Sequence, residues 1–251
     1  MHDAPNATLG LIVLQSDETI EDDFRHLLPP AVRLHVSRVP SGETVTPETL
    51  AAMEGHLTAA ATLLPRAARF DAIGYGCTSG TAQIGTARIA ERVRAGAACA
   101  AVTEPVSALI AACRALGLAR IAFLSPYVES VSARLRAVLA AAGIDTPTFD
   151  SFDEPSEAAV ARLPTAATIE RGRALAARGG VDGLFLSCTN LRTLEAIPEL
   201  ERVTGRPVLS SNQVLAWHMA SLAQVPSSHA LPGRLGDPDD PLPVGHLNRP
   251  S

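Results

Sequence analysis

The chain has 251 residues, of which 47% are hydrophobic and only 4% aromatic, so it can bury a sizeable core as one large domain or as two small ones. Its formal net charge of -5 argues against a nucleic-acid partner, because phosphate binding needs clustered Lys and Arg. No apolar run approaches the ~20 residues of a membrane span and no signal peptide is evident, so we expect a cytoplasmic protein without a membrane partner.

Strand-like and helix-like segments alternate along the first half of the chain. Continuous apolar runs are typical of parallel strands with both faces covered, and capping residues or prolines indicate where the intervening helices begin and end. We predict strands at 8–15, 32–39, 70–76 and 98–103. We predict helices before Pro29, between Pro47 and Pro65, and at 79–94.

The second half repeats this order. We predict strands at 120–125, 146–152, 181–187 and 207–210, and helices at 105–116, 127–142, 156–178 with a break near Pro164, 191–203 and 213–222. In each half the third strand ends at a Cys-Thr pair, which indicates an internal duplication. The pattern predicts an α/β fold of two pseudo-symmetric lobes, each a parallel sheet flanked by helices, with the active site in the cleft between them.

We place the first lobe at residues 1–104 and the second at 105–210, and we expect the last helix, within 211–224, to pack back on the first lobe. Residues 225–251 are rich in Pro, Gly, Asp and Ser and have no hydrophobic periodicity. Such a segment buries too little apolar surface to offset its ordering entropy. We therefore expect a flexible tail that is mobile or draped on the surface.

Two cysteines, Cys77 and Cys188, lie where a predicted strand ends and a helical pattern begins. Free amides and the helix dipole at such a position stabilise a thiolate, so we expect lowered thiol pKa values. A lone cysteine is commonly only a packing residue, but two at equivalent strand ends predict an acid-base pair acting on opposite sides of one carbon. The polar residues that follow them can bind a carboxylate: Thr78, Ser79, Thr189 and Asn190.

Other polar residues border the same predicted cleft. Gln15 and Asp17 follow the first strand, where Asp17 either contacts substrate or only caps its helix. Tyr127 follows the equivalent strand of the second half and could donate its hydroxyl to an oxyanion, with a core role as the alternative. The segment 210–212, Ser-Ser-Asn, either binds a polar group or forms a turn.

The remaining motifs indicate neither a metal nor a cofactor. Cys99 and Cys113 lie in alanine-rich segments and are expected to be packing residues. The cysteines form no CxxC pair and the histidines no HExxH motif, so we predict no metal site. The segment Gly-Tyr-Gly at 74–76 lacks the third glycine of a dinucleotide-binding motif, and no GxxxxGK[ST] loop is present. We therefore expect chemistry without a cofactor.

These motifs resemble a known family. The duplicated α/β layout, with Gly-Cys-Thr-Ser-Gly at 76–80 and Ser-Cys-Thr-Asn at 187–190, resembles the aspartate/glutamate racemase superfamily, in particular its maleate isomerase and arylmalonate decarboxylase branch. The resemblance covers most of residues 8–224. Within that branch, Leu-Gln-Ser-Asp-Glu-Thr-Ile-Glu-Asp at 14–22 is most similar to the ectoine-utilisation proteins called EutA.

The resemblance implies a cofactor-free isomerase that acts on a small carboxylate at the lobe interface. Maleate isomerases use two cysteines, which implies that role for Cys77 and Cys188, with a tyrosine at the position of Tyr127. Two asparagines of that family correspond to Asp17 and to a position near Glu157. These acidic replacements argue against maleate and favour a substrate with an amino group. Decarboxylases of the branch retain only the cysteine that matches Cys188, so the presence of Cys77 disfavours decarboxylation.

Three functions are compatible with this sequence. The leading hypothesis is a racemase or isomerase of an amino-acid-like carboxylate, with an acetylated diaminobutyrate as the substrate that the ectoine-degradation resemblance implies. The second is cis-trans isomerisation, in which Cys77 adds to an alkene and is later expelled. The third is a ligand-binding homologue without turnover. The expected partner is a small-molecule carboxylate, and the sequence is also compatible with a homo-oligomer.

Overall fold

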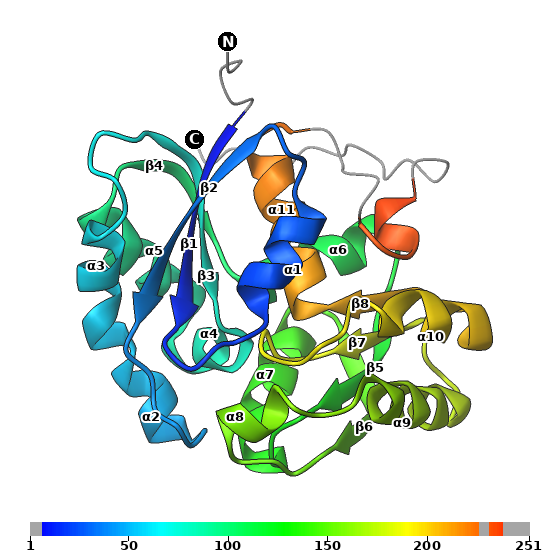
Figure 1. Cartoon of the computed structure of the whole chain (residues 1–251). Coiled ribbons are helices and arrows are strands. Elements are labelled where there is room, and N and C mark those ends of the chain that lie inside the picture. Colours follow the sequence, from blue (N-terminus) through cyan, green and yellow to red (C-terminus); the bar gives the residue numbers. More distant parts are fainter. Residues whose placement is uncertain (1–6, 226–230, 238–251) are drawn as a thin grey trace.

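Two four-stranded parallel sheets form the framework of the protein, as the computed structural model shows for residues 7–225 and 231–237 (Figure 1). The strand orders are β2-β1-β3-β4 and β6-β5-β7-β8, and every strand pair is parallel. The predicted two-lobed α/β fold is therefore confirmed. The strands are β1 (Ala7–Leu14), β2 (Val32–Val39), β3 (Phe70–Gly76), β4 (Cys99–Thr103), β5 (Arg120–Ser125), β6 (Asp145–Ser151), β7 (Gly183–Leu186) and β8 (Val208–Ser210).

Helices lie against both sheets (Figure 1). They are α1 (Ile20–Leu27), α2 (Pro47–Ala52), α3 (Glu54–Thr62), α4 (Thr78–Ile84), α5 (Thr86–Gly96), α6 (Pro105–Ala115), α7 (Glu129–Ala141), α8 (Glu157–Val160), α9 (Thr165–Ala177), α10 (Ala196–Thr204) and α11 (Ser211–Leu222). None of the helices in the described residues is long and apolar enough to cross a membrane.

Three predicted helices differ from the observed ones. The segment predicted as one helix between Pro47 and Pro65 is divided at Met53 into α2 and α3. The segment predicted as one helix at 79–94 is two helices, because Gly85 adopts a φ of 96° and ends α4 before α5 begins. The helix predicted to begin at residue 191 begins at Ala196. The preceding residues form a loop that reaches the first lobe, where the Thr19 hydroxyl donates a 2.9 Å hydrogen bond to the carbonyl of Asn190.

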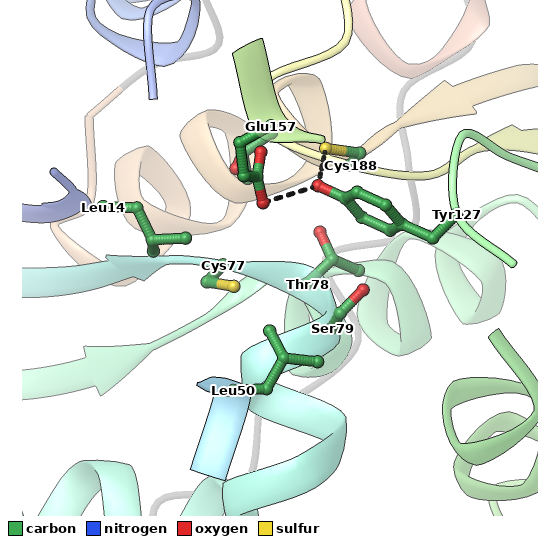
Figure 2. Close-up of a pocket in the computed structure, with 9 residues that line it drawn as sticks. Leu14, Leu50, Cys77, Thr78, Ser79, Tyr127, Glu157 and Cys188 are labelled. Atoms are coloured by element: carbon green, nitrogen blue, oxygen red, sulfur yellow. Dashed lines mark hydrogen bonds between the residues drawn. The ribbon is translucent and has the colours of Figure 1, made fainter. Parts of the chain in front are cut away.

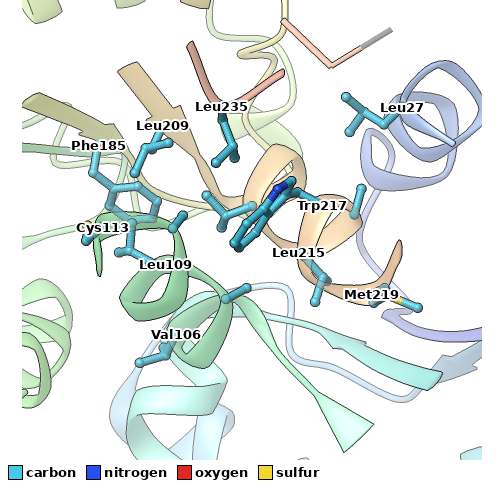
Figure 3. Close-up of a cluster of buried hydrophobic side chains, with 14 of the residues drawn as sticks. Leu27, Val106, Leu109, Cys113, Phe185, Leu209, Leu215, Trp217, Met219 and Leu235 are labelled. Atoms are coloured by element: carbon cyan, nitrogen blue, oxygen red, sulfur yellow. The ribbon is translucent and has the colours of Figure 1, made fainter. Parts of the chain in front are cut away.

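Helix α11 joins the two halves of the core. It contacts β3, β4 and α1 of the first half and α6 and β8 of the second. Figure 3 shows Trp217 and Leu215 of this helix in one apolar cluster with Phe185 of the second sheet. Met219 lies so close to β3 that a Cβ atom on Gly74 would come within 2.5 Å of its sulfur. The exact division of the chain at residue 104 stays a prediction.

A short piece of the proline-rich tail packs on the protein. Residues 234–236 form the 3-10 helix η1 (Arg234–Gly236), and the side chains of Leu231 and Leu235 are buried in the cluster around α11. The Gln213 side-chain amide also donates a 2.6 Å hydrogen bond to the carbonyl of Pro232. The two leucines of this piece bury apolar surface, which favours its packing on the protein. The other residues after 225 lie outside the described part of the chain.

Candidate active site

Cys77 occupies the junction between β3 and α4. It is the N-cap residue of α4, and its Sγ accepts a 3.2 Å hydrogen bond from the amide of Gly80. A Cβ atom on Gly80 would lie 2.8 Å from this sulfur and 2.7 Å from the hydroxyl of Tyr75. Only glycine fits there without displacing the thiol, so the Gly-Cys-Thr-Ser-Gly segment determines where Cys77 lies.

Cys188 follows β7 in a strained backbone conformation, with a φ of 95° that non-glycine residues rarely adopt. Its amide donates a 3.0 Å hydrogen bond to the Ser211 hydroxyl, and its Sγ accepts one of 3.3 Å from the amide of Asn190. The hydroxyl of Tyr127 lies 2.9 Å from the same sulfur. These contacts on both sides of the residue hold the strained turn and orient the thiol.

Both thiols line one small cavity between the lobes (Figure 2). The first half contributes Cys77 and the second half contributes Cys188, and Leu14 and Leu50 cover the apolar side. The volume is about 10 Å³, close to the minimum that holds one water molecule. The structure is therefore closed, because a cavity of this size is too small for a carboxylate substrate. The lining residues are Leu14, Leu50, Cys77, Thr78, Ser79, Tyr127, Glu157, Cys188 and Thr189.

Three residues predicted to bind substrate are not among those lining the cavity. Gln15 is exposed. Asp17 is buried, and its Oδ1 accepts hydrogen bonds from the amides of Thr19 (2.8 Å) and Ile20 (2.9 Å), so the observed contacts are those of a residue that caps α1. Asn190 is buried between the lobes, where its side-chain oxygen accepts a 2.9 Å hydrogen bond from the amide of Glu18.

Glu157 is a cavity residue that strand-end reasoning does not identify, because it begins the short helix α8 and follows no strand directly. Its carboxylate accepts hydrogen bonds from the Tyr127 hydroxyl at 2.9 Å and from the Asn190 side-chain amide at 3.2 Å. Only 4% of Glu157 is exposed. The family resemblance was the one signal in the sequence that pointed to this position.

The expectation of lowered thiol pKa values is wrong for this closed structure. Burial, the largest cause, and the Glu157 carboxylate together raise the pKa of the Cys77 thiol to about 12, although the Gly80 amide opposes the shift. The same two causes raise the pKa of Cys188 well above its ordinary value. Burial also raises the pKa of Asp17 and of Glu157. Both thiols are therefore protonated near neutral pH while the cavity is closed.

Backbone contacts join the segment after β2 to the segment before α8. Thr44 and Ser156 form an antiparallel bridge, and the amide of Val45 donates a 3.0 Å hydrogen bond to the carbonyl of Pro155. Nearby, the guanidinium of Arg162 donates two hydrogen bonds, of 3.0 and 2.9 Å, to the carboxylate of Glu18. The segment after β2 is thus joined to the segment that carries Glu157.

The segment 210–212 contacts the loops that carry the site residues. Ser210 caps α11, whereas Ser211 and Asn212 contact the site loops. The side-chain amide of Asn212 donates to the carbonyl of Thr189 at 2.7 Å and to the carboxylate of Asp23 at 2.8 Å. Within residues 7–225 and 231–237, no three His, Cys, Asp or Glu side chains are grouped so that they could hold a metal ion.

The sequence model of the arylmalonate decarboxylase family matches residues 87–235, more than half of the chain. The chain belongs to the arylmalonate decarboxylase family. Arylmalonate decarboxylase of Bordetella bronchiseptica is 37% identical over 136 residues, which are 54% of this chain and 55% of that enzyme. Members of this family and its maleate isomerase relatives are enzymes of isomerase or lyase type.

Two solved structures of maleate isomerases resemble this protein over more than nine-tenths of its length. The maleate isomerase Iso from Pseudomonas putida S16 has a TM-score of 0.82 and 27% identity, covering 92% of this chain and 98% of that one. A cysteine-to-serine variant of the Nocardia farcinica maleate cis-trans isomerase has a TM-score of 0.76 and 27% identity, covering 91% and 97%. That variant carries a covalently bound succinylcysteine intermediate, so its chemistry is based on cysteine.

Proposed function

We propose that the protein is a cofactor-independent racemase or isomerase of a small, amino-acid-like carboxylate. The observation that carries this proposal is that Cys77 and Cys188, one from each half of the chain, line the same cavity. One sulfur removes a proton from a carbon as a thiolate, and the other returns a proton to the opposite face as a thiol. The two cysteines exchange protonation states in each turnover.

The polar lining supports a carboxylate as the substrate's anchoring group. Thr78, Ser79 and Thr189 line the cavity, and a hydroxyl can donate one hydrogen bond to a carboxylate. In the closed structure the Thr78 hydroxyl donates to Ser211 and the Thr189 hydroxyl donates to the carbonyl of Gly76, so these two turn toward a carboxylate only when substrate binds. A carboxylate next to the reacting carbon also makes its proton more acidic by delocalising the charge that develops. We therefore assign these three residues to carboxylate binding.

The acidic groups near the thiols favour an amino group on the substrate. Glu157 lines the cavity, and the carboxylate of Asp17 is close enough to raise the pKa of both thiols. A second substrate carboxylate would be repelled here, whereas an ammonium or amide N–H would be attracted. Acetylated diaminobutyrate, the substrate implied by the resemblance to ectoine-utilisation proteins, meets this requirement.

Hydrogen exchange in D2O tests this function. The protein is incubated separately with single enantiomers of aspartate, diaminobutyrate and its acetyl derivatives, and the α-position is followed by NMR. We expect deuterium at the α-carbon together with the opposite enantiomer for at least one amino-bearing acid. Absence of exchange with every member of this set contradicts the proposal.

Cis-trans isomerisation is the second candidate, and the likeness to maleate isomerases over more than nine-tenths of the chain favours it. In this reaction the Cys77 sulfur adds to one alkene carbon, and the Cys188 thiol protonates the other. After rotation about the new single bond, the Cys188 thiolate removes a proton from the same carbon while the C–S bond to Cys77 breaks, which gives the trans product and restores both cysteines. Maleate and the Cys188→Ser variant should yield a mass adduct on Cys77, which the Cys77→Ser variant should lack. A Cys77 adduct with fumarate production, and no α-exchange, would replace the racemase proposal.

A further inference from the structure

Three buried groups form a continuous hydrogen-bonded chain beside the cavity (Figure 2). The Sγ of Cys188 lies 2.9 Å from the Tyr127 hydroxyl, which donates a 2.9 Å hydrogen bond to Oε1 of Glu157. The other carboxylate oxygen of Glu157 accepts a hydrogen bond from the Asn190 side chain. Each of Cys188, Tyr127 and Glu157 is 4% exposed, so water does not compete for these contacts.

Because the Tyr127 hydroxyl has a single proton, it can donate to only one of its two partners at a time. When Tyr127 donates to Glu157, its oxygen can only accept from Cys188, and Cys188 must then be a thiol. The opposite direction requires a protonated Glu157 that donates to Tyr127. Tyr127 is then free to donate to a Cys188 thiolate.

We propose that Glu157 is a positioning residue that sets the protonation state of Cys188 through the hydroxyl of Tyr127. The Cys188 thiol gives its proton to the Tyr127 oxygen while the original Tyr127 proton passes to Glu157. One S–H bond breaks, one O–H bond forms on the carboxyl, and the tyrosine is unchanged. Cys188 is therefore a proton donor while Glu157 is ionised, and a proton acceptor only after Glu157 has taken up the proton.

The charges around Glu157 favour a single negative charge that lies on either Glu157 or Cys188. Asp17 faces it from the loop after β1, Cys77 from the start of α4, and Tyr127 and Cys188 from the second lobe. None of the ion pairs in residues 7–225 and 231–237 involves Glu157. Two adjacent anions in a water-excluded site repel each other strongly, so Glu157 and Cys188 do not ionise together.

The Glu157→Gln variant should fix the direction of the hydrogen bonds that join residue 157, Tyr127 and Cys188. The Asn190 side-chain amide requires an acceptor, so the new amide oxygen faces Asn190 and the new NH2 group donates to Tyr127. Tyr127 then donates to Cys188 and stabilises its thiolate. Removal of the carboxylate charge acts in the same direction. Together these changes should lower the pKa of Cys188.

The pH dependence of alkylation by iodoacetamide, followed for the Cys188 peptide by mass spectrometry, tests the proposal. We expect Glu157→Gln to accelerate Cys188 alkylation about tenfold or more at a fixed pH below the thiol pKa. Glu154→Gln is the matched control, because Glu154 lies on the same segment and caps the amide of Ser156 without contacting the thiol. Wild-type and Glu154→Gln proteins should react at similar rates.

The Tyr127→Phe variant separates the hydrogen-bonded chain from a through-space charge effect. It should slow Cys188 alkylation, because the thiolate loses its donor, and the acceleration by Glu157→Gln should disappear in the double variant. Unchanged Cys188 reactivity in Glu157→Gln, or equal acceleration with and without the Tyr127 hydroxyl, overturns the proposal. If Glu157→Gln does not fold, faster alkylation in Tyr127→Phe alone overturns it. The inference rests on the proposed role of Cys188, but this readout measures thiol ionisation and is independent of substrate turnover.

Discussion

The hydroxyl of Ser211 accepts a 2.8 Å hydrogen bond from the hydroxyl of Thr78. It also accepts a 3.0 Å hydrogen bond from the amide of Cys188. Thr78 directly follows Cys77, so one side chain at the start of α11 joins the two cysteine loops. The relative positions of the thiols therefore depend on a residue that does not line the cavity.

The Ser211→Ala variant should be less stable and less active. It leaves a buried hydroxyl and a buried amide without their common acceptor, which costs about 1–3 kcal/mol per unsatisfied group. Urea unfolding and turnover are the measurements. Ser221→Ala, at the partly exposed end of the same helix, is the control and should resemble wild type. Equal stability of the two variants would contradict the role assigned to Ser211.

The Gly80→Ala variant should displace the Cys77 thiol. The added methyl group would lie 2.8 Å from Cys77 Sγ and 2.9 Å from the methyl of Met53, and such overpacking costs about 1–3 kcal/mol. Thermal unfolding and turnover should both decline. Gly55→Ala is the matched control, because a Cβ atom there meets nothing within 4 Å and alanine is the better helix former. Normal turnover in Gly80→Ala would show that the thiol position tolerates this crowding.

Asp23 should make stability depend on pH in a defined window. Burial raises the pKa of its carboxyl from 3.8 to about 7, so the folded protein binds a proton that the unfolded chain has already lost. The stabilisation is fully present below about pH 4 and is lost as the pH rises through about 7. Each pKa unit corresponds to about 1.4 kcal/mol.

The Asp23→Asn variant should remove this loss. Urea unfolding from pH 4 to 8 should show that the variant gains stability relative to wild type as the pH rises, by up to a few kcal/mol. The exposed neighbour Asp22 supplies the control, and Asp22→Asn should retain most of the wild-type loss of stability, because Asp22 is only the last of the causes that raise the Asp23 pKa. A constant difference between Asp23→Asn and wild type across this range would show that Asp23 does not titrate there.

Substrate entry should require separation of Thr44 and Ser156. These residues form an antiparallel bridge over a cavity of about 10 Å³, too small for any carboxylate substrate. A double variant with cysteine at both positions should form a disulfide under oxidation, lose activity, and regain it on reduction. The two single-cysteine variants control for the substitutions themselves. Full activity of the oxidised, cross-linked protein would show that substrate enters by another route.

Much of the fold follows from local sequence. The apolar runs and the prolines and glycines between them predict all eight strands, and the Cys-Thr repeat predicts that Cys77 and Cys188 meet. The break between α4 and α5 was missed because a helical pattern tolerates one glycine, whereas Gly85 adopts a positive φ. Two leucines in a proline-rich segment produce no periodicity, so the sequence does not indicate which part of residues 225–251 packs on the protein.

The electrostatics of the site depend on tertiary structure. A strand-to-helix junction alone predicts a stabilised thiolate and a lowered thiol pKa. In the structure Cys77 is buried in a cavity that Leu14, Leu50 and residues of the second lobe also line, and this burial raises its pKa instead. Glu157 contributes to the same reversal, and it reaches the cavity from α8 instead of a strand end. Contacts between distant segments of this kind leave no spacing pattern in a single sequence.

Deuterium incorporation by the single cysteine variants tests the central claim most directly. With a substrate identified in D2O, Cys77→Ser and Cys188→Ser should each lose interconversion of the enantiomers by about 10²–10⁴-fold. Each should retain exchange with at most one enantiomer, and the two variants should retain opposite ones. Cys99→Ser, which alters a cysteine outside the cavity, should behave like wild type. Racemisation at the wild-type rate by either active-site variant, or exchange of the same enantiomer by both, would contradict the account.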